Sequence, residues 1–454
     1  MTALLERLGL NRPELRAWAL YDWANSAMVT IIVTAVFPIF FAQVAARGLD
    51  PATATRLFTG ATTLGLVVIA LLSPLLGTMA DYSASKLRFL AAFLLLGAVA
   101  TALMFTITPG AWALALGLFV LANIGANGSF VFYDALLPHI ARPDEMDRVS
   151  ASGYAIGYLG GGLLLLGSLV AIQRPDLVGL PTEGTLPVRL TFLVTAVWWA
   201  VFSIPLFRRI AEPPPTPRRP EDVGRSAAAV AVGKLRETIR DLRRYRQAVV
   251  MLVAFLIYND GIGTIIRLAT IYGTEIGIGR GAMIGALVVV QFVGIPFAFL
   301  FGWIAGRIGA KRAIFIGLVA YVAISVVGYF MRTATHFLIL AVLVGTVQGG
   351  TQALSRSLFA GMIPRQKSGE FFGFFSVFEK FAGIFGPAFF LLASLAFGST
   401  RVAILSIILF FVVGGWLLTL VDVDAGRAQA RAEEARLDRL AAERAAPLPI
   451  EDLR

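Results

Sequence analysis

Polar and charged side chains recur at helical spacing inside segments of the sequence that are otherwise strongly apolar. In the first such segment Asp22, Asn25 and Ser26 are spaced i, i+3 and i+4, so they share one face of a helix. A charged group at the centre of a bilayer is costly, and it usually faces a cavity or a partner. The spacing therefore predicts a polar site or path inside a bundle of membrane-spanning helices.

Similar faces recur in three later segments. They hold, in turn, Asn123, Asn127 and Asp134; Asp260, Thr264 and Arg267; and Gln348, Gln352 and Arg356. Acidic, basic, amide and hydroxyl groups together can bind a small solute that carries both charges. The residues predicted to bind substrate are Asp22, Asn25, Ser26, Asn127, Tyr154, Asn259, Asp260, Arg267, Gln352 and Arg356.

Three carboxylates, Asp22, Asp260 and Glu379, are predicted to carry coupling protons, because a carboxylate in changing surroundings can take up and release a proton. Glu379 and Lys380 point about 100° apart on a helix, so at least one of them is expected to face a different neighbour or the membrane interface.

Each assignment has a structural alternative. Asn25 and Asn259 can join helices without touching substrate. Asp260 and Arg267 lie about 10 Å apart along a helix, too far for a tight pair, so each can hold a structural partner. Asp134 lies near the end of its segment and is predicted to be a gate.

Composition places these residues in a membrane. Of the 454 residues 57% are hydrophobic and 15% are charged, and the mean hydropathy is +0.78. A soluble protein carries roughly a quarter charged residues. The chain has no cysteine and two histidines, His139 and His336, which excludes thiolate and His-rich metal sites. No cofactor is expected, and an enzyme is not predicted, because no catalytic constellation is evident.

About twelve apolar segments are each long enough to cross roughly 30 Å of hydrocarbon as a helix. They are expected at 18–45, 58–80, 89–107, 111–138, 151–173, 189–210, 247–272, 282–305, 312–331, 336–363, 371–396 and 402–421. An even number puts both termini on one side, and most of the 39 basic residues fall on that side, which predicts cytoplasmic termini. The net charge of +11 indicates topology and contact with anionic lipid rather than nucleic-acid binding.

Two segments outside the spans are predicted to be cytoplasmic. The central loop, 211–246, begins with a Pro-rich stretch and continues as a basic sequence in which Leu235, Ile239 and Leu242 share a helical face. We expect that helix to lie on the membrane surface and to bind anionic lipid. The tail, 422–454, is expected to form a solvated charged helix.

The two halves of the chain resemble each other. WANSAMVTII (23–32) aligns with IYNDGIGTII (257–266), and two further matches follow in the same order. The duplication predicts an all-α membrane protein with a six-helix half at 1–210 and a second at 247–421, the pattern of the major facilitator superfamily.

A loop motif supports this pattern. Gly77, Asp81, Lys86 and Arg88 resemble the superfamily's Gly-x-x-x-Asp motif with its following basic residues, and the second half keeps the glycine and the bases but not the Asp. The Asp can accept hydrogen bonds from a neighbouring helix N-terminus and so latch one side. The predicted gating residues are Gly77, Asp81, Lys86, Arg88, Asp134, Gly302 and Arg307.

Several longer stretches resemble one family within that superfamily. YDWANSA, GTMADYSASK, FYDALLP, SGYAIGYLGGG, FLIYNDGIGTI, QALSRSLFAGMIP and EFFGFFSVFEKFAGIFGP are similar to the vacuole-effluxer-like family, which is related to fungal autophagy vacuolar exporters. The resemblance implies efflux of small solutes, and amino acid release from the vacuole is the activity associated with the fungal members. The Arg- and Ala-rich composition fits a bacterial inner-membrane member.

We therefore expect a secondary active exporter of a small polar solute, foremost an amino acid, that works as a monomer by alternating access and is coupled to protons. One alternative is export of amphipathic drugs or lipids. The other is a sensor or scaffold that has kept the transporter fold.

Overall fold

The computed structural model describes residues 2–217, 227–240, 242–275, 277–382 and 404–445, with 386, 389–390, 392–393 and 395 between the last two ranges. Some side chains within these ranges, including those of residues 267–272, lie outside the description. Throughout the described part the chain is helical and forms no strand. Ten of the helices found there are long and apolar enough to cross a membrane, or up to eleven if a bent pair counts as one span.

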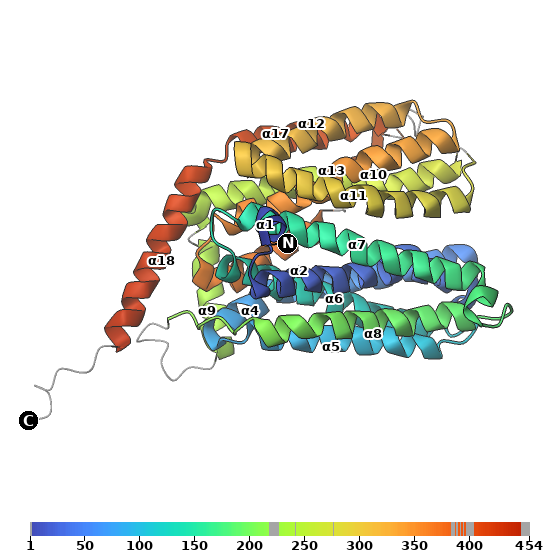
Figure 1. Ribbon diagram of the computed structural model, residues 1–454, viewed down its shortest axis with the longest axis horizontal. Coiled ribbons are helices and arrows are strands. Elements are labelled where there is room, and N and C mark those ends of the chain that lie inside the picture. The colour runs from blue at the N-terminus through green and yellow to red at the C-terminus, as the bar shows by residue number, and fades with distance from the viewer. Residues whose placement is uncertain are drawn as a thin grey trace, which may run out of the picture.

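The helices form two groups that lie side by side in Figure 1. The first group holds α2 (Pro13–Met28), α4 (Pro51–Ser83), α5 (Lys86–Leu103), α6 (Trp112–Ile140), α7 (Met146–Gln173) and α8 (Leu186–Arg209). The second holds α10 (Arg246–Glu275), α11 (Arg280–Ile308), α12 (Ala310–Tyr329) and α13 (Ala334–Ala360). The predicted spans 371–396 and 402–421 are described in part, as α14 (Ser368–Phe381) and α17 (Ile408–Thr419).

Capping residues make the helices longer than the apolar segments that predict them. The second span, expected at 58–80, runs from Pro51 to Ser83. The Asp50 carboxylate accepts a hydrogen bond from the Thr53 backbone N–H at 3.0 Å, and Pro51 occupies the first helical position. These groups start the helix about two turns before its apolar part.

The first span is not a regular α-helix. After α2 it continues as a π-helix at Val29–Ala35, the short helix α3 (Phe37–Phe40) and a second π-helical turn at Phe41–Ala45. A π-helix makes i→i+5 hydrogen bonds and changes which side chains share a face. The directions of side chains beyond Met28 therefore depart from the α-helical pattern.

Close packing of glycines joins α7 to the polar face of the first span. A Cβ atom added at Gly153 would lie 2.8 Å from Asp22 Oδ2, and one added at Gly157 would lie 2.6 Å from Ser26 Oγ. Between the two groups, α7 packs against α11 and α4 packs against α14. These two helix pairs form the interface along which the halves meet.

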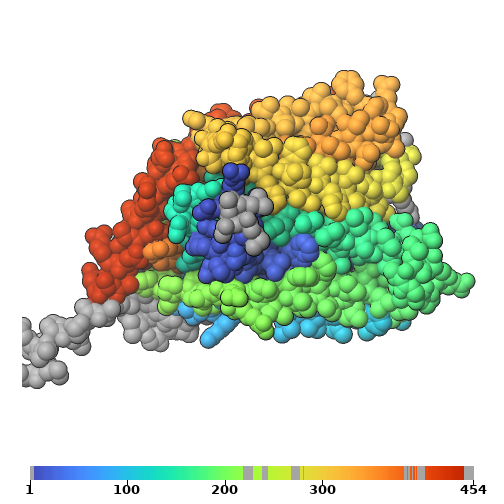
Figure 2. Space-filling view, viewed as in Figure 1, coloured from blue at the N-terminus to red at the C-terminus, as the bar shows by residue number. Residues whose placement is uncertain are grey.

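The first and the last described helices lie toward the same end of the bundle, here named the termini side. Helix α1 (Thr2–Arg7) lies there, and α18 (Val423–Ala445) runs along it in Figures 1 and 2. The expectation of a solvated tail helix is wrong for one face of α18, where Ala430, Glu433 and Leu437 are buried, while most of its other side chains are exposed or half-buried. The helix α9 (Ala227–Arg240) likewise packs on the protein, against α4, with Lys234 buried.

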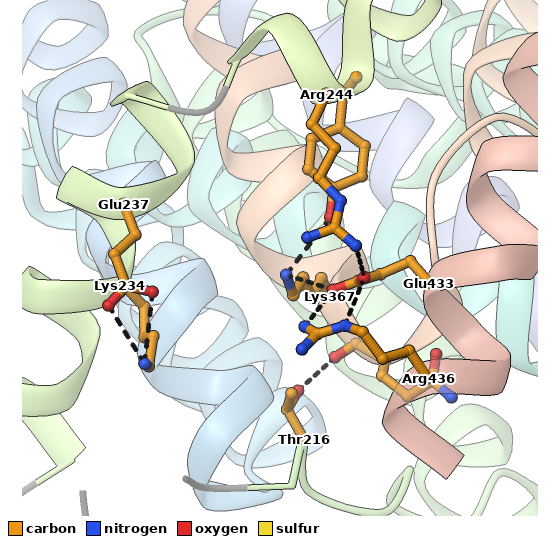
Figure 3. Close-up of polar contacts among 9 residues, drawn as sticks. Thr216, Lys234, Glu237, Arg244, Lys367, Glu433 and Arg436 are labelled. Atoms are coloured by element: carbon orange, nitrogen blue, oxygen red, sulfur yellow. Dashed lines mark hydrogen bonds and ion pairs between the residues drawn. The ribbon is translucent and has the colours of Figure 1, made fainter. Parts of the chain in front are cut away.

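An ion-pair cluster holds α18 in place (Figure 3). The Glu433 carboxylate lies 2.5 Å from Arg244 of the central loop, 3.1 Å from Lys367 and 2.7 Å from Arg436. Desolvation opposes ionisation of this carboxylate, but hydrogen bonds from Arg436 and the charge of Lys367 outweigh it and lower the pKa of Glu433 to about 2. The pairs tie the tail to the central loop and to the turn before α14.

Removing the charge of Glu433 is expected to loosen the tail. Because its pKa is lowered on folding, the stabilisation is present above the ordinary value near 4.5 and is lost as the pH falls toward 2. At pH 7 the Glu433→Gln variant leaves three cations without their carboxylate, so tryptic cleavage within α18 should be about tenfold faster. Glu443→Gln, on an exposed position of the same helix, is the control. Equal cleavage rates in the two variants would contradict a docked tail.

Candidate functional site

A cavity of about 440 Å³ lies between the two halves. Its wall is built by the first span, α6 and α7 from one half and by α10, α11, α13 and α14 from the other. Along α13 the lining extends from Phe337 to Arg356, which corresponds to roughly 28 Å of helix. The cavity therefore extends along most of α13, and its Arg356 end lies toward the termini side.

Arg356 closes that end of the cavity. Its side chain is 4% exposed, and it donates to Asp134 Oδ1 at 2.9 Å, to Ser150 Oγ at 2.9 Å and to the Ser150 carbonyl at 3.0 Å. Its second carboxylate neighbour, Asp22 Oδ2, is 3.6 Å away and accepts a hydrogen bond from the Tyr133 hydroxyl at 3.0 Å. A guanidinium can stay charged in such a buried position because carboxylates and carbonyls face its N–H groups.

Aromatic rings surround the same guanidinium. The Arg356 carbon Cζ lies 4.7 Å from the centroids of both the Trp18 and Tyr154 rings and 5.6 Å from that of Tyr133. Trp18 stacks on Tyr133 with centroids 4.5 Å apart. All of these partners belong to the first half, whereas Arg356 belongs to the second. The side chain therefore bridges the halves at the termini side.

The structure brings many of the predicted ligands to one cavity. Six of them line it: Asp22, Ser26, Asn127, Tyr154, Gln352 and Arg356. The predicted coupling residue Glu379 and the predicted gating residue Asp134 line it as well. Residues predicted separately as ligand and as gate, Arg356 and Asp134, form one ion pair.

Three predicted ligands do not line the cavity. Asn25 is fully buried, and its Nδ2 donates to Ser129 Oγ at 3.2 Å. Asn259 Oδ1 accepts from Gln352 Nε2 at 3.4 Å. Asp260 Oδ2 accepts from the Gly386 backbone N–H at 2.7 Å. Each of these contacts joins two helices, which matches the structural alternative to substrate binding for that residue. The side chain of Arg267 lies outside the described residues.

Glu379 and Lys380 both face the cavity and pair with each other at 2.7 Å, so the expectation that they face different neighbours is wrong. The reason lies in the helix end. Helix α14 ends at Phe381, and Ala382 has extended ψ, so Lys380 is in the last turn, where its long side chain can turn back toward Glu379.

Sequence reasoning missed Gln291 and Thr30, which also line the cavity. Gln291 Nε2 of α11 donates to Thr30 Oγ1 of the first span at 2.9 Å, a further polar contact between the halves. A signal for it was present, since Gln291 is the only amide in the apolar run 281–301. Thr30 lies within the π-helix, where the 3.6-residue period does not apply.

The predicted latch is assembled on the termini side. The buried Asp81 carboxylate accepts from the backbone N–H groups of Gly369 at 2.9 Å and Glu370 at 2.8 Å, in the first turn of α14. Lys86 Nζ lies 2.6 Å from Asp81 Oδ1. A carboxylate at a helix N-terminus is favoured by the helix dipole as well as by these hydrogen bonds. The latch joins α4 of one half to α14 of the other.

The other predicted gating residues have simpler surroundings. A Cβ atom at Gly77 would lie 2.0 Å from the Gly369 carbonyl oxygen, so α4 and α14 touch there. Gly302 packs against Ala151 of α7 in the same way. Arg307 stacks on Trp303 at 3.8 Å, and Arg88 is exposed.

The central loop reinforces this closure. Glu212 accepts from the backbone N–H groups of Lys86 and Leu87 at 2.6 and 2.9 Å, which caps α5. The Thr216 backbone N–H donates to the Asp81 carbonyl at 2.7 Å. The Thr216 hydroxyl, labelled in Figure 3, donates to the Gln366 carbonyl at 2.5 Å. The loop therefore crosses the interface between the halves.

Asn25→Ala separates a helix-joining role from substrate binding. The variant should lose about 1 kcal/mol of stability, because one buried hydrogen bond is removed, while substrate affinity stays within twofold. Gln348→Ala, which changes an amide that lines the cavity, is the matched variant and should weaken affinity. Thermal unfolding and ligand titration of both variants measure this. A larger affinity loss for Asn25→Ala than for Gln348→Ala would show that Asn25 reaches the substrate.

Comparisons with known proteins agree with this architecture. The model of the family described as "Vacuole effluxer Atg22 like" matches residues 51–431. The "Uncharacterized MFS-type transporter YxiO" of Bacillus subtilis is 37% identical over 406 residues, which cover 89% of this chain and 94% of that protein. Autophagy-related protein 22 of Coccidioides immitis is 24% identical over 78% of this chain and 70% of its own length.

Solved structures show the same fold. The major facilitator superfamily transporter FucP in the outward conformation superposes with a TM-score of 0.67 at 13% identity, covering 90% of this chain and 100% of that one. The human organic anion transporter MFSD10 gives 0.64 at 14% identity, covering 90% and 99%. The chain is an MFS-type transporter that belongs to the Atg22-like vacuole effluxer family of the major facilitator superfamily.

Proposed function

We propose that this transporter exports a small solute of the amino-acid class by alternating access, coupled to protons. The observation that carries the proposal is the presence of both signs of charge in the lining of one cavity. Arg356 and Lys380 are cationic, and Asp22, Asp134 and Glu379 are anionic. A zwitterion needs both kinds of partner within a few ångströms of each other.

The unequal contacts of Arg356 suggest how a substrate enters this cluster. The Asp134 contact is short, at 2.9 Å, and the Asp22 contact is long, at 3.6 Å. A substrate carboxylate that takes the position of Asp22 beside the guanidinium leaves the Asp22 carboxylate to hold the substrate ammonium. Since Asp22 belongs to one half and Arg356 to the other, the exchange replaces a direct contact between the halves with one through the substrate.

We assign proton coupling to carboxylates whose cationic partner changes during the transport cycle. A carboxylate that loses its cationic partner in a buried site favours its neutral form and takes up a proton. Asp22 and Glu379 line the cavity and are in this position, each with a cation nearby. Asp260, the third candidate, is held by the Gly386 backbone away from the cavity, so we assign coupling to the first two.

Proteoliposome transport tests the proposal. A thermal-shift screen of amino acids, peptides and nucleosides on purified protein identifies a ligand, and counterflow of that ligand follows. We expect an imposed pH gradient to drive uptake by wild-type protein and not by Glu379→Gln. Glu183→Gln, on an exposed loop, is the control and should behave as wild type. If no amino acid stabilises the protein or exchanges across the vesicle, the substrate class is wrong; if pH never alters transport, coupling is wrong.

Apolar residues in the rest of the cavity wall favour a second candidate, export of amphipathic compounds. Phe130, Met283, Phe337, Leu340 and Val344 line it. A hydrophobic cation would bind to these residues and would not need Arg356. This candidate would be selected if amphipathic cations stabilise both the wild-type protein and the Arg356→Lys variant, and amino acids stabilise neither.

The membrane placement belongs to the same proposal. We place the termini side in the cytoplasm of a bacterial inner membrane, with the basic central loop near anionic lipid and the protein as a monomer. Because the chain has no cysteine, a single introduced cysteine is its only thiol. In the Glu443→Cys variant we expect an impermeant maleimide to label the protein only after the cells are lysed, which would support this orientation.

A further inference from the structure

A second cavity, of about 360 Å³, lies on the termini side and is separate from the transport cavity. Its wall comes from the first half at the α6–α7 connection, from the second half at the end of α13, and from the tail helix α18. The two halves already touch in this wall, where Ser357 Oγ donates to Asp147 Oδ1 at 2.6 Å. The cavity is complete only when α18 is docked.

Arginines dominate the charged lining. Five of them line it: Arg12, Arg142, Arg365, and Arg427 and Arg431 of the tail helix. Against these five the wall holds two carboxylates, Asp147 and Glu434. Both carboxylates already accept hydrogen bonds, Asp147 from Ser357 and Glu434 from the Arg365 backbone N–H at 2.8 Å.

Several of the guanidinium groups have unused donors. Arg142, Arg427 and Arg431 form no ion pair with any carboxylate in the part of the chain that the structure describes. Arg12 bonds to the Ile140 carbonyl and to Glu145, yet its Nε is buried and has no hydrogen-bond partner among the described residues. A guanidinium group can donate two parallel hydrogen bonds to two oxygens of one phosphate, and clusters of arginines recognise phosphate in this way.

We propose that the arginines of this cavity bind the phosphate oxygens of an anionic ligand. The ligand is either a soluble phosphate compound with two or more negative charges close together, or the headgroup of a phospholipid. Arg142 belongs to the first half, and Arg427 and Arg431 belong to the tail that is docked on the second. A bound anion therefore ties the halves and the tail together on the termini side. It favours the state in which the latch at Asp81 is closed.

Thermal unfolding of purified full-length protein in detergent tests the site. Pyrophosphate is the soluble probe, and phosphatidylglycerol is the lipid probe. We expect one of them to raise the apparent melting temperature of wild-type protein. In the double variant Arg427→Gln/Arg431→Gln the apparent Kd should rise at least about tenfold, since charge-assisted hydrogen bonds are removed. Arg439→Gln, exposed on the same helix, is the matched control and should keep the wild-type Kd.

A second variant guards against loss of folding. Arg142→Gln changes an exposed side chain in the other half and should weaken binding in the same direction. Stabilisation by pyrophosphate assigns a soluble ligand, and stabilisation by phosphatidylglycerol alone assigns a lipid headgroup. Stabilisation by neither probe, or an equal response from wild type and both variants, overturns the proposal. No transport is measured, so the outcome is independent of the function proposed above.

Discussion

Replacing Arg356 with Ala is expected to abolish transport and to lower the free energy of unfolding by about 3–5 kcal/mol. The change leaves Asp22 and Asp134 close together in a buried site without their cation, and it leaves Ser150 without its donors. Removal of one member of a buried ion pair is costly because the other charge keeps its desolvation penalty. It also removes the cation that we propose binds the substrate carboxylate.

A double-variant cycle distinguishes these two effects. Arg356→Gln/Asp134→Asn removes one positive and one negative charge together, so it should recover a large part of the stability lost in Arg356→Gln. It should not recover transport, because no cation is restored. Arg332→Ala, at an exposed position, is the control for loss of an arginine. Unfolding in a thermal-shift assay and counterflow in proteoliposomes measure the two outcomes. Wild-type transport by Arg356→Ala would refute the role of the cluster.

Replacing Gly77 with Val is expected to open the termini side. A Cβ atom at this position would lie 2.0 Å from the Gly369 carbonyl oxygen. The atoms that it meets belong to the backbone of α14, so no side-chain rotation can relieve the clash. The helices α4 and α14 must separate, and the hydrogen bonds from Gly369 and Glu370 to Asp81 are then broken. Overpacking of this kind costs about 1–3 kcal/mol, so the population of the closed state relative to the open state should fall by about 5- to 150-fold.

Thiol labelling measures this shift, since the chain has no cysteine of its own. Ser368 is fully buried at the start of α14, and a cysteine placed there should react slowly in the parent and about tenfold faster with Gly77→Val. Gly60→Val on the same helix is the matched control, because a Cβ atom at Gly60 meets nothing within 4 Å. Equal labelling rates for the two variants would mean that the contact at Gly77 does not hold the halves together.

The predicted fold class and family were confirmed. A bilayer requires long apolar helices, and in the part of the chain that the structure describes ten helices long and apolar enough to span it coincide with apolar segments of the sequence. The all-α architecture and the family also follow from the sequence, from the duplication and from stretches such as YDWANSA. Helical spacing indicated the polar faces, because residues three and four apart lie side by side whatever the helix packs against.

The tertiary structure alone decided which polar residues reach the cavity. Asn25 and Ser26 are neighbours in sequence and both were predicted ligands, yet Ser26 lines the cavity and Asn25 bonds to Ser129 between helices. A 3.6-residue period defines a face but not the angle at which it is turned toward its neighbours. That angle depends on contacts between distant segments, such as Gly157 against Ser26.

The cluster at Arg356 shows the same division between sequence and structure. Sequence patterns identified Asp22, Asp134 and Arg356 as unusual charges within apolar spans. Their meeting depends on how two halves pack, since 222 positions separate Asp134 from Arg356 along the chain. The sequence by itself determined that these charges need partners in the membrane, because burial makes an isolated charge costly. Only the packing of one half on the other decided which partners they have.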